Sequence, residues 1–220
     1  MITVTLARPW LVAALPRRMR VLSWAPFAPG FVAADRVVWR EVRNADLTPE
    51  FDVDRWFAAE MAAYPGAVGM LTSRDIGTHS FAEVEVDGLR AACLATVGLS
   101  NAEAVGTRLP YHSADYGTIN LCTAVEAGLT EAAQIEALAI AVQARTAAVM
   151  AVGLQLATGI ATGTGTDCAA LACDAGEGRY AGMHTAVGEA VGAATRTAVA
   201  RAAADWVVWR DAERLRRGLA

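Results

Sequence analysis

Residues 81–98 read FAEVEVDGLRAACLATVG. Two strand-like runs, residues 81–86 and 89–98, flank the dipeptide Asp87-Gly88. Asp-Gly between two such runs is a strong signal for a β-hairpin with a two-residue turn. A hairpin at this point argues against a purely doubly wound sheet, whose parallel strands are joined by helical crossovers. The stretch therefore predicts a largely antiparallel or mixed sheet.

The residues before this hairpin predict further strands and one short helix. Strand-forming side chains are concentrated in residues 20–24, 37–42 and 67–72. Thr48-Pro49-Glu50 predicts the start of a short amphipathic helix, because a proline at the first helical position gives up no hydrogen bond. Pro65-Gly66 predicts the end of that helix.

The residues after the hairpin predict two more strands, over residues 117–123 and 164–172, and two long helices. Thr130 predicts the N-cap of a helix over residues 131–150. Its apolar side chains cover nearly every side, so this helix is expected to be buried. The last helix is expected from about residue 181 or 184 to residue 206, with a charged, solvated helical end over residues 210–217. The sequence thus predicts one compact α+β domain over residues 1–220, with a largely antiparallel or mixed sheet packed against two long helices.

The charged and glycine residues exclude several classes of function. The net charge of −4 gives no electrostatic reason to expect a nucleic-acid partner. All 19 basic residues are arginine, which excludes a Schiff-base lysine and the lysine of a phosphate-binding P-loop. Gly163 and Gly165 do not form a dinucleotide-binding fingerprint, because Cys168 stands at the third glycine position.

The cysteines and the N-terminal residues indicate the compartment. No CxxC pair occurs, and the cysteines are expected to be buried free thiols. They are Cys93, Cys122, Cys168 and Cys173. Residues 1–24 hold no continuous apolar core that leads to a cleavage site, and no apolar run is long enough to span a membrane. A cytoplasmic protein without a membrane partner is expected.

Short polar stretches lie beside apolar runs at four places. They are residues 99–102 (LSNA), 117–120 (GTIN), 162–167 (TGTGTD) and 180–189 (YAGMHTAVGE). The chain has three Asn and three His, and these stretches contain Asn101, Asn120 and His184. Hydroxyl, amide and carboxylate groups at the ends of rigid elements can converge on one ligand. The four stretches are therefore the candidates for a binding or catalytic site.

A few aromatic and imidazole side chains are further candidates. His112 lies in an expected loop that could cover the site. The tryptophans are expected mainly in core or surface packing, and Trp24, Trp39 and Trp56 are the ones that could line an apolar cleft.

The order of the four stretches resembles the adenosylcobinamide amidohydrolase family. Residues 69–75 (GMLTSRD) and 95–99 (ATVGL) also resemble that family, so the resemblance spans roughly residues 60–200. It implies hydrolysis of the amide that joins aminopropanol to the corrin propionate of adenosylcobinamide, which gives adenosylcobyric acid for corrinoid salvage and cobalamin (vitamin B12) synthesis. The expected partner is a corrinoid small molecule, whose cobalt belongs to the substrate. No metal bound by the protein and no other cofactor are expected, and a homo-oligomer is left open.

Amide hydrolysis needs an activated nucleophile, an oxyanion site and an acid for the departing amine. With the resemblance, His184 and either Asp167 or Glu189 are the acid–base candidates, and Asn101 and Asn120 the positioning or oxyanion donors. Water is preferred as the nucleophile over Thr166 or Ser100, because no side chain has a strong nucleophile signature. The expected substrate-binding residues are Ser100, Thr118, Gly163, Thr164, Gly165, Thr166 and Thr185.

Other interpretations of the same residues stay open. The chain could be a corrinoid-binding protein without catalysis, in which these groups hold the amide side chains of the ring and His184 ligates cobalt. It could also be an amidase for an unrelated amide. At the level of single residues, the glycines could serve only close backbone packing, and the two asparagines only turn capping.

Overall fold

Eight strands form one mixed sheet in the computed structural model, which describes residues 1–43, 50–108, 110 and 117–218. The strand order is β4-β3-β2-β12-β8-β6-β5, and β1 also pairs with β2. The strands are β1 (Thr3–Ala7), β2 (Trp10–Ser23), β3 (Gly30–Glu41), β4 (Val68–Thr72), β5 (Ser80–Val86), β6 (Leu89–Val97), β8 (Ile119–Leu129) and β12 (Cys168–Ala175). Only the pairs β3–β4 and β8–β12 are parallel. The predicted mixed sheet is confirmed.

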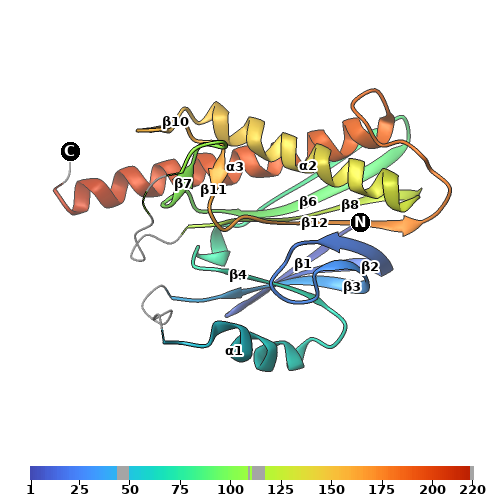
Figure 1. Ribbon diagram of the computed structural model, residues 1–220, viewed down its shortest axis with the longest axis horizontal. Coiled ribbons are helices and arrows are strands. Elements are labelled where there is room, and N and C mark those ends of the chain that lie inside the picture. The colour runs from blue at the N-terminus through green and yellow to red at the C-terminus, as the bar shows by residue number, and fades with distance from the viewer. Residues whose placement is uncertain (44–49, 109, 111–116, 219–220) are drawn as a thin grey trace.

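The sheet folds over on itself, so that its two halves face each other (Figure 1). Strands β1–β4 make the N-terminal half-sheet, and β5, β6, β8 and β12 make the C-terminal half-sheet. Trp39 of β3 and Met70 of β4 lie in the same buried cluster as Cys122 of β8. The inner faces of the two halves therefore pack against each other as in a β-sandwich.

Helices cover the outer faces of both half-sheets (Figure 1). The two long helices α2 (Glu131–Ala151) and α3 (Ala186–Arg216) lie on the C-terminal half-sheet, and the short helix α1 (Val53–Glu60) lies on the N-terminal half-sheet. The molecule is thus layered helix, sheet, sheet, helix. The predicted packing of the sheet against two long helices is confirmed.

The hairpin that indicated the fold class forms as predicted. Strands β5 and β6 pair in antiparallel register. The pairing begins beside the turn, where Val86 lies opposite Leu89, and continues away from it. The two turn residues have positive φ angles, 51° at Asp87 and 77° at Gly88. This is the backbone that a tight hairpin turn requires and that Asp-Gly readily adopts.

The structure corrects several of the expected boundaries. The runs predicted at residues 20–24 and 37–42 are the ends of two long strands, β2 and β3, whose pairing shifts register between Ala14 and Met19. Helix α1 begins at Val53, where the Asp52 side chain accepts a hydrogen bond from the Arg55 nitrogen at 3.0 Å. Thr48 and Pro49, which were expected to open this helix, lie outside the described residues. The strand expected over residues 164–172 divides into the two-residue strand β11 (Gly163–Thr164) and β12.

Helix α2 is the clearest wrong expectation. Its predicted cap is confirmed, because the Thr130 hydroxyl accepts from the Ala133 nitrogen at 3.3 Å. The helix nevertheless lies in an outer layer, and Ile135 is 54% exposed. Many of the apolar residues of α2 are alanines, which can lie at the surface of a helix. The apolar residues on nearly every side of α2 therefore led us to expect a more deeply buried helix. Among the helices of the described residues, none has the length and hydropathy that crossing a membrane requires.

Candidate active site

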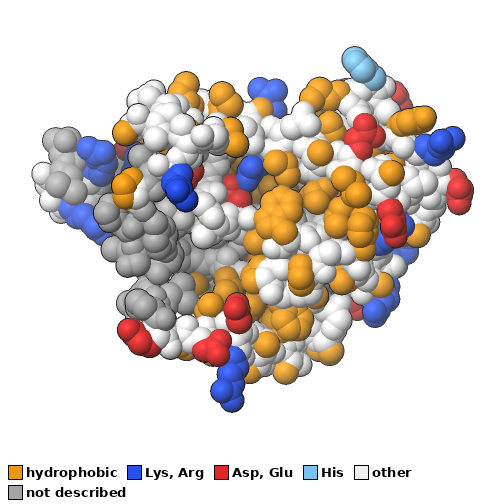
Figure 2. Space-filling model, viewed as in Figure 1, with side chains coloured by type: hydrophobic (Ala, Val, Ile, Leu, Met, Phe, Trp, Pro, Cys, Tyr) orange, Lys and Arg blue, Asp and Glu red, His pale blue; other side chains and the backbone are white. Residues whose placement is uncertain are grey.

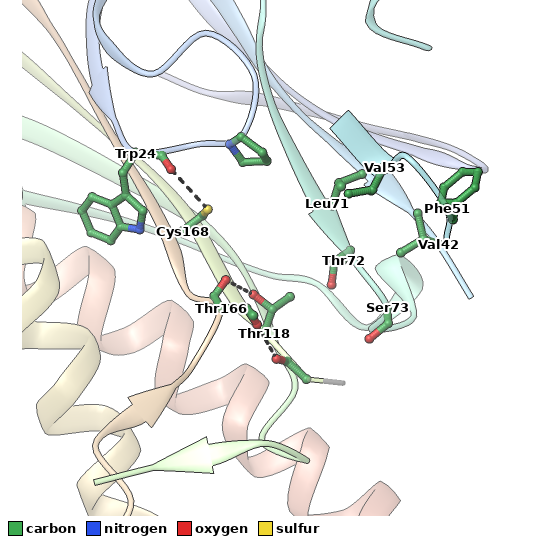
Figure 3. Close-up of a pocket in the computed structure, with 12 residues that line it drawn as sticks. Trp24, Val42, Phe51, Val53, Leu71, Thr72, Ser73, Thr118, Thr166 and Cys168 are labelled. Carbon is green, nitrogen blue, oxygen red and sulfur yellow. Dashed lines mark hydrogen bonds between the residues drawn. The ribbon is translucent and has the colours of Figure 1, made fainter. Parts of the chain in front are cut away.

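A cavity of about 470 Å³ lies where the two half-sheets meet at one end of the fold. Figure 3 shows Thr118, Thr166 and Cys168 on one side of it and Leu71, Val42 and Phe51 on the other, with Thr72 and Ser73 between them. The complete lining consists of Trp24, Pro26, Val42, Phe51, Val53, Leu71, Thr72, Ser73, Gly117, Thr118, Thr166 and Cys168. The site is therefore assembled from six separate segments of the chain.

Strand alternation explains which side chains reach the cavity. Neighbouring residues of a strand point to opposite faces of the sheet. On β8 and β12, the even-numbered residues Cys122 and Ala170 pack between the half-sheets, whereas Leu121 and Leu171 pack under the long helices. Asn120 and Cys168 share the even-numbered side, and Thr118 and Thr166, which lie just before the two strands, line the cavity with Cys168. The start of each strand thus presents hydroxyl, amide and thiol groups toward the space between the halves.

The other wall of the cavity is apolar. Leu71, Val53 and Phe51 contribute to it, and Trp24 lines the cavity while remaining 44% exposed. On the face shown in Figure 2, hydrophobic side chains gather over the middle and charged side chains lie mostly toward the margin. Apolar walls with a few placed polar groups are typical of small-molecule sites. The expectation that Trp24 lines an apolar cleft is confirmed, whereas Trp39 is fully buried in the core.

Three of the predicted site residues form a hydrogen-bonded group beside the cavity, and one of them, Asn120, joins the two half-sheets. The Asn120 amide donates to the Leu71 carbonyl at 2.7 Å. The Thr118 hydroxyl donates to the Thr166 carbonyl at 2.7 Å and lies 3.1 Å from the side-chain oxygen of Asn120. The Thr166 hydroxyl donates to the Gly117 carbonyl at 2.8 Å. These bonds fix the polar wall, and one N–H of the Asn120 amide is left for another acceptor.

Asp167 faces away from the cavity, toward α2. Its buried carboxylate pairs with Arg145 and accepts from the Ile119 nitrogen at 3.0 Å, and from the Thr164 nitrogen at 3.0 Å and hydroxyl at 2.5 Å. Burial raises the pKa of this carboxyl group, although Arg145 and the hydrogen bonds act in the opposite direction. The carboxylate therefore ties the start of β8 to the turn that carries Thr166.

The glycines of the TGTGTD stretch have different roles. A Cβ atom on Gly163 would lie 2.7 Å from the Asp167 carboxylate and 3.4 Å from the Arg145 guanidinium, so Gly163 makes room for the buried ion pair. A Cβ atom on Gly165 would meet no other atom within 4 Å. Close packing is thus the reason for the first glycine but not for the second.

Ser100 and Asn101 lie directly behind the cavity wall. A Cβ atom on Gly117, which lines the cavity, would lie 2.7 Å from the Ser100 nitrogen and 3.0 Å from the side-chain oxygen of Asn101. That oxygen is buried without a hydrogen-bond partner. Both residues therefore pack closely against Gly117 of the cavity wall.

His184, Thr185 and Glu189 lie at the other end of the C-terminal half-sheet. The Ala181 nitrogen just before them donates to Glu136, in the second turn of α2, at 2.7 Å, and α2 follows directly after the end of β8. The eleven residues of β8 span about 35 Å at roughly 3.3 Å per residue. The structure therefore does not bring His184 or Glu189 to the cavity or to Asp167 within one chain.

The HTxxGE stretch has a structural role at that end. Thr185 is the N-cap of α3: its hydroxyl accepts from the Gly188 nitrogen at 3.0 Å and donates to the Gly182 carbonyl at 2.8 Å. A Cβ atom on Gly188 would lie 2.1 Å from that same carbonyl oxygen. His184 and Glu189 themselves are exposed. His112, the other histidine considered, lies outside the described residues.

Sequence reasoning missed some residues of the cavity as site residues. Thr72 and Ser73 line it, and the available signal was a pair of hydroxyl residues at the end of a buried strand. Cys168 also lines it, two residues after Thr166 on the same face. All four cysteines are free, as expected. Burial raises the pKa of Cys168 to about 11, so its thiol is protonated at neutral pH.

The fold and the cavity define an α+β protein with a cavity between the halves of a folded sheet. A sequence model of the adenosylcobinamide amidohydrolase family matches residues 2–211. The chain belongs to this family. It is also similar to the adenosylcobinamide amidohydrolase of Halobacterium salinarum, with 35% identity over 162 residues. That alignment covers 70% of this chain and 66% of the relative, so the chain spans somewhat less than two thirds of the relative's length.

Proposed function

We propose that this protein hydrolyses the aminopropanol amide of adenosylcobinamide to adenosylcobyric acid and aminopropanol, for corrinoid salvage and cobalamin synthesis. The family to which the chain belongs and the name of its haloarchaeal relative support this activity. The observation that carries the proposal in the molecule itself is the cavity, in which strand ends with hydroxyl groups face an apolar wall.

The size of the cavity suits one arm of the substrate rather than the whole. Cavities of roughly 300–1,000 Å³ enclose drug-sized ligands, and a corrinoid with an adenosyl group is larger than these. The cavity, at about 470 Å³, would accept the propionamide arm with its aminopropanol. The corrin ring would then rest outside, against the exposed aromatic surface that includes Trp24.

In the proposed reaction, water adds to the amide carbonyl carbon, the C–N bond breaks, and the products are a carboxylate and a protonated amine. The hydroxyl groups of Ser73, Thr118 and Thr166 would orient the amide by hydrogen bonds. The remaining N–H of Asn120 would be a neutral donor to the carbonyl oxygen. Asp167 would act through Thr166 and the start of β8, as a positioning residue. The cytoplasmic location and the lack of a metal bound by the protein remain predictions from the sequence.

The proposal is tested by incubating the purified protein with adenosylcobinamide and measuring adenosylcobyric acid and free aminopropanol by mass spectrometry. Formation of product by the wild type, and less product in Thr166→Val than in the control variant Thr5→Val, would support the reaction and its position at the cavity. Thr5 is exposed on β1. Cleavage that is unaffected by every substitution in the cavity would place the reaction elsewhere on the chain.

One observation favours a second candidate, a corrinoid-binding protein without catalysis. Among the described residues that line the cavity, none carries a carboxylate or an imidazole, the groups that most often transfer protons in hydrolysis. A carrier would need only the walls and the hydrogen bonds. Tight binding of adenosylcobinamide without product would support this candidate. A visible-spectrum change that is lost in His184→Ala would indicate cobalt ligation at the remote, exposed histidine.

A further inference from the structure

Arg74 is a buried cation that forms no ion pair with any carboxylate of the described residues. The residue is 8% exposed, and its Nε atom is buried without a hydrogen-bond partner. The other well-buried arginines of the described chain have partners: Arg145 pairs with Asp167, and Arg40 pairs with Glu60. No carboxylate in the described residues forms an ion pair with Arg74. A buried charge in this state is costly unless something else compensates it.

The groups that face Arg74 compensate its charge only in part. Its guanidinium lies over the ring of Trp209 on α3, 5.0 Å from the ring centroid. Asp75 and Asp205 act on it only at longer range, and Asp75 itself pairs with Arg8. Burial lowers the pKa of Arg74, as expected when desolvation outweighs the attraction of neighbouring acids. Arginine stays protonated at any physiological pH, so the unmatched charge remains.

Arg74 lies at the edge of the cavity. It follows Thr72 and Ser73, which line the cavity, and its backbone nitrogen donates to the Thr72 hydroxyl at 3.1 Å. A Cβ atom on Gly98 would lie 3.7 Å from the Cβ of Arg74 and 3.4 Å from the backbone nitrogen of Thr118. The backbone and Cβ of Arg74 therefore lie beside the polar wall where the proposed reaction would take place, and its guanidinium lies over Trp209.

We propose that Arg74 binds the negative charge that the reaction creates on the substrate's carbonyl oxygen and leaves on the product carboxylate. This inference rests on the proposed function. Addition of water to the amide turns the neutral carbonyl into an oxyanion, and breakage of the C–N bond leaves a carboxylate with the same charge. A guanidinium matches both groups, since it can donate two parallel hydrogen bonds to a carboxylate. The neutral substrate amide gains less from the cation than the oxyanion does, which is the condition for catalysis.

The test compares Arg74→Met and Arg74→Lys with the wild type, and uses Arg90→Met as a control. Arg90 is an exposed arginine that pairs with Glu126 away from the cavity. In Arg74→Met, kcat for adenosylcobinamide should fall about 10²–10³-fold, the usual loss for one oxyanion donor, with little change in KM. Inhibition by adenosylcobyric acid should weaken roughly tenfold to hundredfold. Arg74→Lys should lose less of both, and Arg90→Met should match the wild type.

A folded Arg74→Met protein with unchanged kcat and unchanged product inhibition would overturn the inference. If Arg74→Met does not fold, Arg74→Lys is decisive, because wild-type kcat and product inhibition in that variant would also overturn it. A wild-type protein that binds corrinoids without cleaving them would contradict the proposed function. The role of Arg74 would then be tested by binding alone. The inference would be supported if the wild type binds adenosylcobyric acid more tightly than adenosylcobinamide and Arg74→Met loses this difference. It would be overturned if the wild type shows no such difference.

Discussion

The amide of Asn120 donates a hydrogen bond to the carbonyl of Leu71 at 2.7 Å, across the space between the two half-sheets. Asn120 stands on β8, in the middle of the C-terminal half-sheet, whereas Leu71 stands on β4, the last strand of the N-terminal half-sheet. The bond closes the folded sheet beside the cavity. It gives Asn120 a structural task in addition to its proposed role as a donor to substrate.

Replacement of Asn120 by alanine should therefore destabilise the protein. The Leu71 carbonyl loses its donor, and a polar group left unpaired costs about 1–3 kcal/mol. Urea unfolding followed by circular dichroism measures the change. Asn101→Ala is the matched control, because the side-chain oxygen of Asn101 has no partner to lose, and it should cost less than about 1 kcal/mol. Equal losses in the two variants would contradict the importance of the bond.

The two glycines of the TGTGTD stretch should respond differently to alanine. Gly163→Ala would force a methyl group to within 2.7 Å of the Asp167 carboxylate, and overpacking of this kind costs about 1–3 kcal/mol. Gly165→Ala meets open space and should leave the free energy of unfolding within about 0.5 kcal/mol of the wild type. The comparison requires only the urea midpoints of the two variants. A stable Gly163→Ala protein would mean that the Arg145–Asp167 pair moves aside easily.

The Cys168 thiol should react slowly at neutral pH. Burial raises its pKa to about 11, and only the thiolate is nucleophilic. Its alkylation by iodoacetamide, located by peptide mass mapping, should therefore accelerate about tenfold per pH unit up to that value. In the unfolded chain the thiol should titrate near the ordinary value of about 8.5. Since the folded pKa is the higher one, the stability that this thiol contributes is present below about pH 8.5 and lost as the pH rises toward 11. A rate that levels off near pH 8.5 in the folded protein would contradict this prediction.

His184→Ala should leave the hydrolysis of adenosylcobinamide within a factor of about two, because His184 is exposed at the end of the half-sheet remote from the cavity. The resemblance to the family favoured the opposite outcome. Thr185→Ala, which removes the cap of α3, should cost about 1 kcal/mol of stability. A loss of activity in His184→Ala without a loss of stability would show that the reaction takes place at that end, or that a second chain contributes it to the cavity.

The local features of the fold were accessible from the sequence. Asp87-Gly88 fixed the hairpin, and Thr130 fixed the start of α2, because turns and caps depend on a few neighbouring residues. The folding of the sheet onto itself was not accessible. It depends on contacts such as Asn120 with Leu71, between residues that are far apart in the chain.

The candidate site was accessible only in part. The polar stretches around Thr118 and Thr166 were identified because hydroxyls beside apolar runs are visible in the sequence. The direction of the Asp167 side chain was not, because it depends on Arg145 of a packed helix. The position of His184 follows from the length of β8 and the direction of α3. No local pattern indicates either of these.

Strand β2 belongs to both halves of the sheet. Its first part pairs with β1 and β3, and its last residues, Arg20 to Ser23, pair with β12 as well. The two halves therefore share one continuous backbone ladder and cannot swing apart as rigid bodies without breaking it. The amide arm of a corrinoid would have to enter the cavity by rearranging side chains at the rim. The rate of its entry should then depend on rotamer exchange rather than on a hinge.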